Sequence, residues 1–144
     1  MGERSALASP VFIAGTTRSG TTLLGLMLDH HPAVAFPGEF GWAVGPPEEL
    51  PDGLDYVTRF RLDRQRRHLE LRVDPSLDED ALVRSFLTQL HARCGPGVEV
   101  FGMTLHGGWA RALALWPDAR FVRLVRDGRD VCASWMRLGW HGNA

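Results

Sequence analysis

Short apolar runs rich in strand-forming residues alternate along the chain with segments of helical periodicity. The first run, 11–14, reads Val-Phe-Ile-Ala and stops at Gly15. We expect strands over residues 11–14, 33–36, 98–102 and 120–125. We expect helices over residues 21–30, 76–93, 109–116 and 127–138, with weaker helical character over 54–71. The alternation predicts an α/β fold in three layers, a central parallel sheet flanked by helices.

The helix over 76–93 and the last helix have the clearest signals. Ser76 and Glu79 have the spacing of a capping box. One face of that helix is apolar, formed by Leu82, Phe86, Leu87 and Leu90. Asp127 is expected to cap the last helix, and Arg129 to be a surface or pairing residue. The first helix, apolar over most of 23–28, is expected to be buried.

The length of 144 residues is enough for a hydrophobic core, so we expect a single domain over residues 1–144. Residues 41–53 are rich in glycine and proline and are expected to form a loop. With the weakly helical segment that follows, this loop makes an insert of loop and helix over 41–76, for which the sequence indicates no role.

Opposite charges nearly balance along the chain. The formal net charge is -1, which argues against a broad electrostatic surface for nucleic acid or for a membrane. Residues 1–10 lack the pattern of a secretory signal, and no stretch approaches the roughly 18 apolar residues of a membrane-spanning helix. Cys94 and Cys132 have neither metal-ligand nor disulfide spacing and are expected to be packing residues. These features predict a cytoplasmic protein without a metal site.

A loop rich in hydrogen-bond donors separates the first strand from the first helix. It spans residues 15–22 and reads Gly-Thr-Thr-Arg-Ser-Gly-Thr-Thr. The glycines permit a compact loop with converging N–H groups, and the N-terminus of the helix adds donors and a favourable dipole for an anion. The Arg18 guanidinium and the hydroxyls of Ser19, Thr21 and Thr22 add further donors. The loop therefore predicts a phosphate-binding site in a P-loop-like fold.

The loop differs from that of nucleoside triphosphatases at one position. In GxxxxGK[ST] a lysine precedes the last hydroxyl residue, whereas Thr21 stands there in this chain, which contains no lysine at all. The usual contact to β- and γ-phosphates is then missing, so a P-loop kinase or NTPase is the less favoured interpretation. The use of arginine throughout in place of lysine is a compositional hint of a bacterial genome of high GC content.

Two segments resemble motifs of the sulfotransferases that use 3′-phosphoadenosine 5′-phosphosulfate. Residues 12–24 are similar to the 5′-phosphosulfate loop, in the RSGTT form of tyrosylprotein, carbohydrate and bacterial members. Residues 120–134 are similar to the 3′-phosphate segment, in which an arginine and a serine eight residues later bind the 3′-phosphate. Here these two positions are Arg126 and Ser134, and the two motifs occur in the family's order.

The resemblance implies transfer of a sulfuryl group to an acceptor hydroxyl, with no metal required. Arg126 and Ser134 would bind the 3′-phosphate. Arg18 would also stabilise charge on the bridging oxygen of the leaving group. The 5′ end would be bound by Gly15, Thr17, Arg18, Ser19, Gly20, Thr21 and Thr22.

Several side chains are candidates for the general base that this chemistry needs. Glu39 follows the second strand, and its offset from Arg18 resembles that of the catalytic glutamate in tyrosylprotein-type members. His30 and His106 are weaker alternatives. His31 precedes Pro32 in a helix-ending pattern, and we interpret it as structural.

Two departures from the family pattern leave alternatives open. Many relatives carry a lysine in a GxKTP-like segment, but residues 102–106 read Gly-Met-Thr-Leu-His, so Arg111 is a candidate replacement. Relatives also continue well beyond the second motif, whereas this chain ends ten residues after Ser134. We therefore consider a shortened catalytic domain, a homo-oligomer that completes the domain, and a non-catalytic nucleotide-binding fragment. The acceptor class stays open, although the arginines within 59–67 would suit an acidic acceptor.

Overall fold

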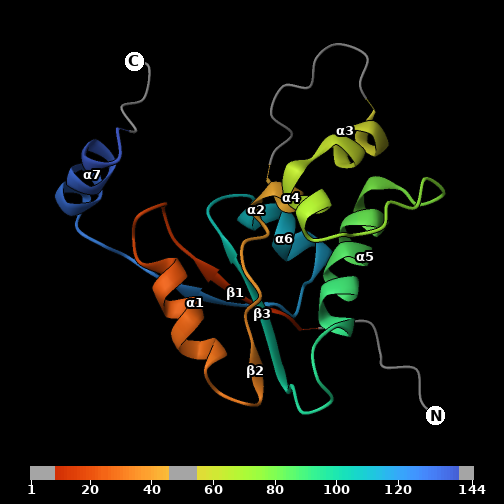
Figure 1. Ribbon diagram of the computed structural model, residues 1–144, viewed down its shortest axis with the longest axis horizontal. Coiled ribbons are helices and arrows are strands. Elements are labelled where there is room, and N and C mark those ends of the chain that lie inside the picture. Colours follow the sequence, from red (N-terminus) through yellow and green to blue (C-terminus); the bar gives the residue numbers. More distant parts are fainter. Residues whose placement is uncertain (1–8, 46–54, 140–144) are drawn as a thin grey trace.

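The computed structural model describes residues 9–45 and 55–139 and has a parallel sheet at its centre (Figure 1). The sheet has four strands in the order β2-β3-β1-β4. These are β1 (Val11–Ala14), β2 (Val34–Ala35), β3 (Val100–Leu105) and β4 (Arg120–Arg123). In the register, Ala14 at the end of β1 lies opposite Leu105 on one side and Arg123 on the other. The carboxyl ends of β3, β1 and β4 therefore form one edge of the sheet.

Helices lie on both faces of this sheet, as the sequence predicts. Figure 1 shows α1 on one face, α5 and α6 on the other, and α7 set apart beyond β4. The helices are α1 (Thr21–Asp29), α2 (Gly41–Val44), α3 (Tyr56–Leu62), α4 (Arg64–His68), α5 (Glu79–Ala92), α6 (Trp109–Leu115) and α7 (Gly128–Arg137). No helix in the described part of the chain is both long enough and apolar enough to cross a bilayer.

The main core lies between the sheet and the helices α2, α3, α5 and α6. Because side chains alternate along a strand, Phe12 and its register partner Met103 point into this core, while Ile13 and Thr104 point to the face of α1. The apolar face predicted for α5 is confirmed, since Leu82, Phe86, Leu87 and Leu90 are all buried.

The expectation that the first helix is buried is wrong. Only Thr21 and Gly25 of α1 are buried. Gly25 lets the helix approach the sheet, since a Cβ there would lie 3.8 Å from both Ile13 Cδ1 and Thr104 Oγ1. The outer side of the helix is apolar but open, with exposed fractions of 62–65% for Leu23, Leu26 and Met27. A high fraction of apolar residues alone does not show whether a helix packs against the protein on one side or on both sides.

Two local expectations also need correction. Residues 41–44, expected to lie in a loop, form the short helix α2; residues 46–54 of that loop lie outside the described residues. The cap of α5 is Asp78, whose carboxylate accepts from the Ala81 N–H at 2.7 Å, while Ser76 donates to Asp74 instead.

The two cysteines differ in their surroundings, and both are free thiols. Cys94 is partly buried, and this burial raises the pKa of its thiol. Cys132 is exposed on α7, so the expectation that it is a packing residue is wrong.

Candidate functional site

Four segments of the chain meet at the carboxyl edge of the sheet. The Gly15 N–H donates to the Leu105 carbonyl at 3.3 Å, and the Leu124 N–H donates to the Ala14 carbonyl at 2.7 Å. On the far side of β3, Thr104 pairs with the stretch around Glu39: the Thr104 N–H donates to Gly38 O and the Phe40 N–H to Thr104 O, both at 2.9 Å. The loop after β1 therefore lies between the segments that follow β2, β3 and β4, where α/β folds commonly bind ligands.

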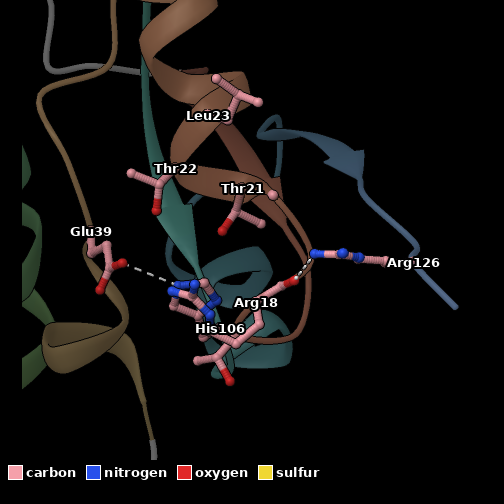
Figure 2. Close-up of a pocket in the computed structure, with 9 residues that line it drawn as sticks. Arg18, Thr21, Thr22, Leu23, Glu39, His106 and Arg126 are labelled. Carbon is pink, nitrogen blue, oxygen red and sulfur yellow. Dashed lines mark hydrogen bonds and ion pairs between the residues drawn. The ribbon is translucent and has the colours of Figure 1, made fainter. Parts of the chain in front are cut away.

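A pocket of about 310 Å³ opens at this edge (Figure 2). Its lining combines two guanidinium groups, threonine hydroxyls, a carboxylate and an imidazole. The lining residues are Thr17, Arg18, Gly20, Thr21, Thr22, Leu23, Glu39, His106 and Arg126. Most of the predicted site residues thus come together. The lining also includes Leu23, which was not predicted, and His106, which was expected only as a weaker candidate base.

Gly15 and Ser19 were expected to bind the ligand, but they are not among the lining residues. Ser19 is buried, and its hydroxyl donates to the Thr16 carbonyl at 2.6 Å within the loop. A Cβ on Gly15 would lie 2.6 Å from Ser19 Oγ and 3.0 Å from the Leu124 carbonyl oxygen. These two residues therefore give the loop its shape.

The turn of the loop depends on two left-handed residues. Arg18 has φ 69° and Gly20 has φ 101°, and α1 begins directly after Gly20. A left-handed arginine is uncommon, and such strain at a concave polar site is typical of a functional position. The first N–H groups of α1 have no acceptor within the helix and lie at the wall of the pocket, where they can bind an anion.

The two sequence motifs are joined by direct hydrogen bonds. Arg18 Nε donates to Ser134 Oγ at 3.0 Å. Arg126 Nη1 donates to the Arg18 carbonyl oxygen at 3.1 Å (Figure 2). Arg126 Nε also lies 4.0 Å from Asp130 Oδ2. Arg126 thus supports the strained Arg18 backbone, and Arg18 reaches α7. Ser134 is in contact with the site through Arg18 although it does not line the pocket.

The expected roles of Asp127 and Arg129 are confirmed. Asp127 caps α7 by accepting from the Arg129 N–H at 2.9 Å, and its carboxylate pairs with Arg129 Nη2 at 2.8 Å. The hydrogen bonds from the Arg129 side chain and backbone lower the pKa of Asp127. Neither residue lines the pocket, so the positive charge that faces the pocket from this segment is Arg126.

His106 links Glu39 to the loop. It directly follows β3, with Nε2 3.2 Å from Glu39 Oε1 and Nδ1 3.0 Å from the Gly15 carbonyl oxygen. The His106 side chain is 20% exposed and that of Glu39 is 50% exposed. His30, the other histidine considered as a base, is the C-cap of α1, at the end of that helix opposite the pocket. The neighbouring His31 accepts a hydrogen bond at Nδ1 from the Ala33 N–H at 3.2 Å. The structural role expected of His31 is therefore confirmed.

A comparison with protein-family models identifies the chain's relatives. The model of the sulfotransferase family matches residues 10–144. The chain belongs to the sulfotransferase family. The α/β fold and the P-loop-like architecture expected from the sequence are thereby confirmed.

Among curated sulfotransferases, one from Caenorhabditis briggsae named "Putative protein-tyrosine sulfotransferase" is 28% identical over 134 residues. The match covers 86% of this chain and 41% of that protein. The chain therefore spans about two fifths of the length of this relative, and both sequence motifs lie within the matched family region.

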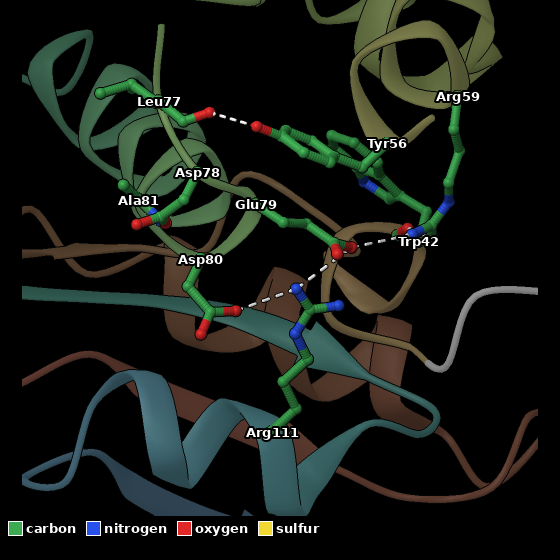
Figure 3. A network of polar contacts seen from close by, with 9 residues as sticks. All are labelled: Trp42, Tyr56, Arg59, Leu77, Asp78, Glu79, Asp80, Ala81 and Arg111. Carbon is green, nitrogen blue, oxygen red and sulfur yellow. Dashed lines mark hydrogen bonds and ion pairs between the residues drawn. The ribbon is translucent and has the colours of Figure 1, made fainter. Parts of the chain in front are cut away.

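Arg111, the candidate substitute for the lysine found in many sulfotransferases, lies elsewhere. Its Nη2 is 3.0 Å from Asp80 Oδ1 and 3.2 Å from Glu79 Oε1, at the start of α5 (Figure 3). It does not line the pocket. The guanidinium groups of the pocket are those of Arg18 and Arg126. Among the described residues, no group of three or more histidine, cysteine or acidic side chains is placed to hold a metal ion.

Proposed function

We propose that this sulfotransferase chain binds 3′-phosphoadenosine 5′-phosphosulfate at the carboxyl edge of the sheet and transfers its sulfuryl group to an acceptor hydroxyl. The observation that carries the proposal is the contact between the two motifs, Arg18 to Ser134 and Arg126 to the Arg18 carbonyl. It places two guanidinium groups in one pocket, which suits a ligand with separate anionic groups at its 5′ and 3′ ends.

The residues divide into two binding groups. In the proposal, the first N–H groups of α1, the Thr21 and Thr22 hydroxyls and Arg18 bind the phosphosulfate. Arg126 and Ser134 bind the 3′-phosphate. A helix N-terminus favours an anion through its dipole as well as its donors, so the 5′ end would be held by backbone and side chain together.

The proposed reaction moves one sulfuryl group and one proton. A bond forms between the acceptor oxygen and sulfur, and the bond between sulfur and the bridging phosphate oxygen breaks. 3′-Phosphoadenosine 5′-phosphate leaves with the electron pair of that bond. Glu39 accepts the proton of the acceptor hydroxyl, and the Arg18 guanidinium stabilises the charge that grows on the bridging oxygen.

A second candidate, nucleotide binding without turnover, is favoured by the chain's lack of lysine. At the end of β3, the segment that carries lysine in many relatives holds the buried Thr104, and Arg111 pairs with α5 instead. The name of the curated relative makes a peptide with a tyrosine the first acceptor to test.

Thermal unfolding with added nucleotide tests the proposal. 3′-Phosphoadenosine 5′-phosphate at a hundred times its Kd should stabilise the chain by about 2.7 kcal/mol, and ADP or ATP with magnesium should have a smaller effect. Arg126→Ala should abolish the stabilisation. Arg120→Ala is the matched control, since Arg120 is an exposed arginine at the amino end of β4. Equal stabilisation by ATP would contradict the proposal; binding without turnover of a tyrosine peptide would select the second candidate.

A further inference from the structure

The His106 imidazole is held at both of its nitrogen atoms. Nδ1 lies 3.0 Å from the Gly15 carbonyl oxygen, and Nε2 lies 3.2 Å from Glu39 Oε1. The sheet register sets this geometry, because the pairing of Ala14 with Leu105 brings Gly15 and His106 side by side. Glu39 reaches the imidazole from the other side of β3, where it pairs with Thr104.

The two contacts fix where protons must lie. A carbonyl oxygen only accepts hydrogen bonds, so Nδ1 must carry a hydrogen. A neutral imidazole with its hydrogen on Nδ1 has a lone pair on Nε2, which would face a carboxylate oxygen that also only accepts. The contact between Nε2 and Oε1 is therefore a hydrogen bond only if one proton lies between them. The pair then has no net charge, either as imidazolium and carboxylate or as imidazole and carboxylic acid.

We infer that His106 is the positioning residue for Glu39: it ties the carboxylate to the Gly15 carbonyl of the anion-binding loop and supplies the proton between Nε2 and Oε1. The inference rests on the proposed function, in which Glu39 is the base. Because Oε1 is occupied by His106, the second oxygen, Oε2, is the one left for the acceptor hydroxyl. Glu39 is half exposed, so an acceptor can reach it from solvent.

The charges around the pair suit this arrangement. Arg18 and Arg126 line the same pocket, from the loop and from the segment after β4, and Glu39 is the carboxylate of the lining. On taking the acceptor proton at Oε2, the pair gains one positive charge. That positive charge develops while the leaving nucleotide gains negative charge. His106 and the two arginines would therefore all stabilise the negative charge of the leaving nucleotide.

The imidazole tautomer tests the inference without any need for turnover. Histidine labelled with ¹⁵N gives separate signals for Nδ1 and Nε2, and His106→Gln assigns those of His106 among the six histidines. We expect the neutral His106 imidazole to keep its hydrogen on Nδ1, whereas the neutral imidazole of free histidine carries it mainly on Nε2. Glu39→Gln should leave that hydrogen in place and move the Nε2 signal. A hydrogen on Nε2 alone, or an Nε2 signal that does not respond to Glu39→Gln, would overturn the inference.

A matched pair of variants separates the two contacts. The amide of His106→Asn mimics Nδ1 and can still donate to the Gly15 carbonyl, whereas the amide of His106→Gln mimics Nε2 and can still donate to Glu39. With 3′-phosphoadenosine 5′-phosphosulfate and 4-methylphenol as probes, we expect His106→Asn to keep nucleotide affinity but lose about 100-fold in kcat, as misplaced groups do. His106→Gln should recover part of that loss.

The outcomes keep this inference apart from the proposed function. Unchanged kcat in both variants, or equal loss of affinity and kcat in both, would overturn the positioning role. Failure of the unsubstituted protein to bind the nucleotide or to turn over would contradict the proposed function, while the tautomer would still decide whether His106 bridges Gly15 and Glu39.

Discussion

Gly15 is the position in the loop over residues 15–22 with the least room for a side chain. A Cβ there would lie 2.6 Å from Ser19 Oγ, 2.9 Å from Thr21 Cγ2 and 3.0 Å from the Leu124 carbonyl oxygen. The carbonyl belongs to backbone next to β4 and cannot turn away. We expect Gly15→Ala to lower the free energy of unfolding by about 1–3 kcal/mol, as overpacking does, and to abolish nucleotide binding.

Chemical denaturation and the thermal-shift assay measure these two effects. Gly97→Ala is the matched control, since nothing lies within 4 Å of a Cβ at that position. It should leave both properties unchanged. A Gly15→Ala protein that binds nucleotide like the parent would show that the loop is not the binding element.

Arg18 combines a strained backbone with a charged side chain. Its φ of 69° lies in the left-handed region, where a residue with a Cβ costs roughly 1–2 kcal/mol. Arg18→Gly relieves this cost and Arg18→Ala does not, although both remove the guanidinium. We expect Arg18→Gly to be more stable than Arg18→Ala by about 1 kcal/mol in urea denaturation, with nucleotide binding lost in both. Equal stabilities would contradict the claim that strain is stored at this residue.

At the scale of single elements, the sequence predicts those strands and helices whose positions depend on nearby residues. The strand at 11–14, the following loop and α1 lie in one short stretch, and the structure has them where they were predicted. The helix α2 was missed because its four residues begin with a glycine and lie in a stretch rich in glycine and proline. The cap of α5 was misassigned because Ser76 and Asp78 are both good caps, and the turn at Asp74 engages Ser76.

The contact between His106 and Glu39 could not be predicted from local signals. The two residues are 67 positions apart, and their meeting depends on which strands are neighbours and in which register they pair. The position of His106 shortly after the strand predicted over 98–102 was the one available signal; β3 continues to Leu105, so His106 lies directly at the carboxyl edge. The same limit applies to Arg111, whose partners on α5 follow from helix packing.

The helix α7 should be the element that responds most to the nucleotide. It has no buried residue, and Ser134 joins it to the loop through the Arg18 hydrogen bond. A ligand that binds Arg126 and Ser134 together would hold the helix against the pocket. We expect amide exchange over 128–137 to slow by tenfold or more when 3′-phosphoadenosine 5′-phosphate is added, because exchange there reports local opening.

Exchange in α5 serves as the internal control for this measurement. That helix has five buried apolar residues and makes no part of the pocket lining, so its exchange should change little. Ser134→Ala should weaken the slowing in α7. Unchanged exchange in α7 at saturating nucleotide would place the 3′-phosphate elsewhere.

Across the whole molecule, the sheet order gives the site its composition. β1 lies between β3 and β4, so the loop that follows it receives His106 from one neighbour and Arg126 from the other. Glu39 lies in the segment that follows β2, and this segment pairs with Thr104 on the side of β3 away from β1. The loop over residues 15–22 is thus central, with Glu39 on one side and Arg126 on the opposite side. In the proposed reaction, the acceptor and the 3′ end of the nucleotide would therefore approach from different directions.

A polar network away from the site holds the helical layer together, and Arg111 belongs to it (Figure 3). Glu79 on α5 lies 3.2 Å from Arg111 of α6 and 3.5 Å from Arg59 of α3, and Arg59 also donates to the Trp42 carbonyl at 3.2 Å. Since the Arg111 side chain is only 24% exposed, its loss should cost more than that of an open surface pair. We expect Arg111→Ala to lower stability by about 1 kcal/mol and to leave nucleotide affinity unchanged.

A double-mutant cycle with Asp80→Ala measures the coupling directly. Arg111 Nη2 lies 3.0 Å from Asp80 Oδ1, so the two substitutions should be less than additive in denaturation experiments, and salt should reduce the coupling energy. Nucleotide affinity and turnover are measured on the same proteins. Loss of turnover in Arg111→Ala at full stability would show instead that Arg111 reaches the transferring group and replaces the lysine that the chain lacks. Loss of stability at full affinity would leave Arg18 and Arg126 as the positive charges that act on the cosubstrate.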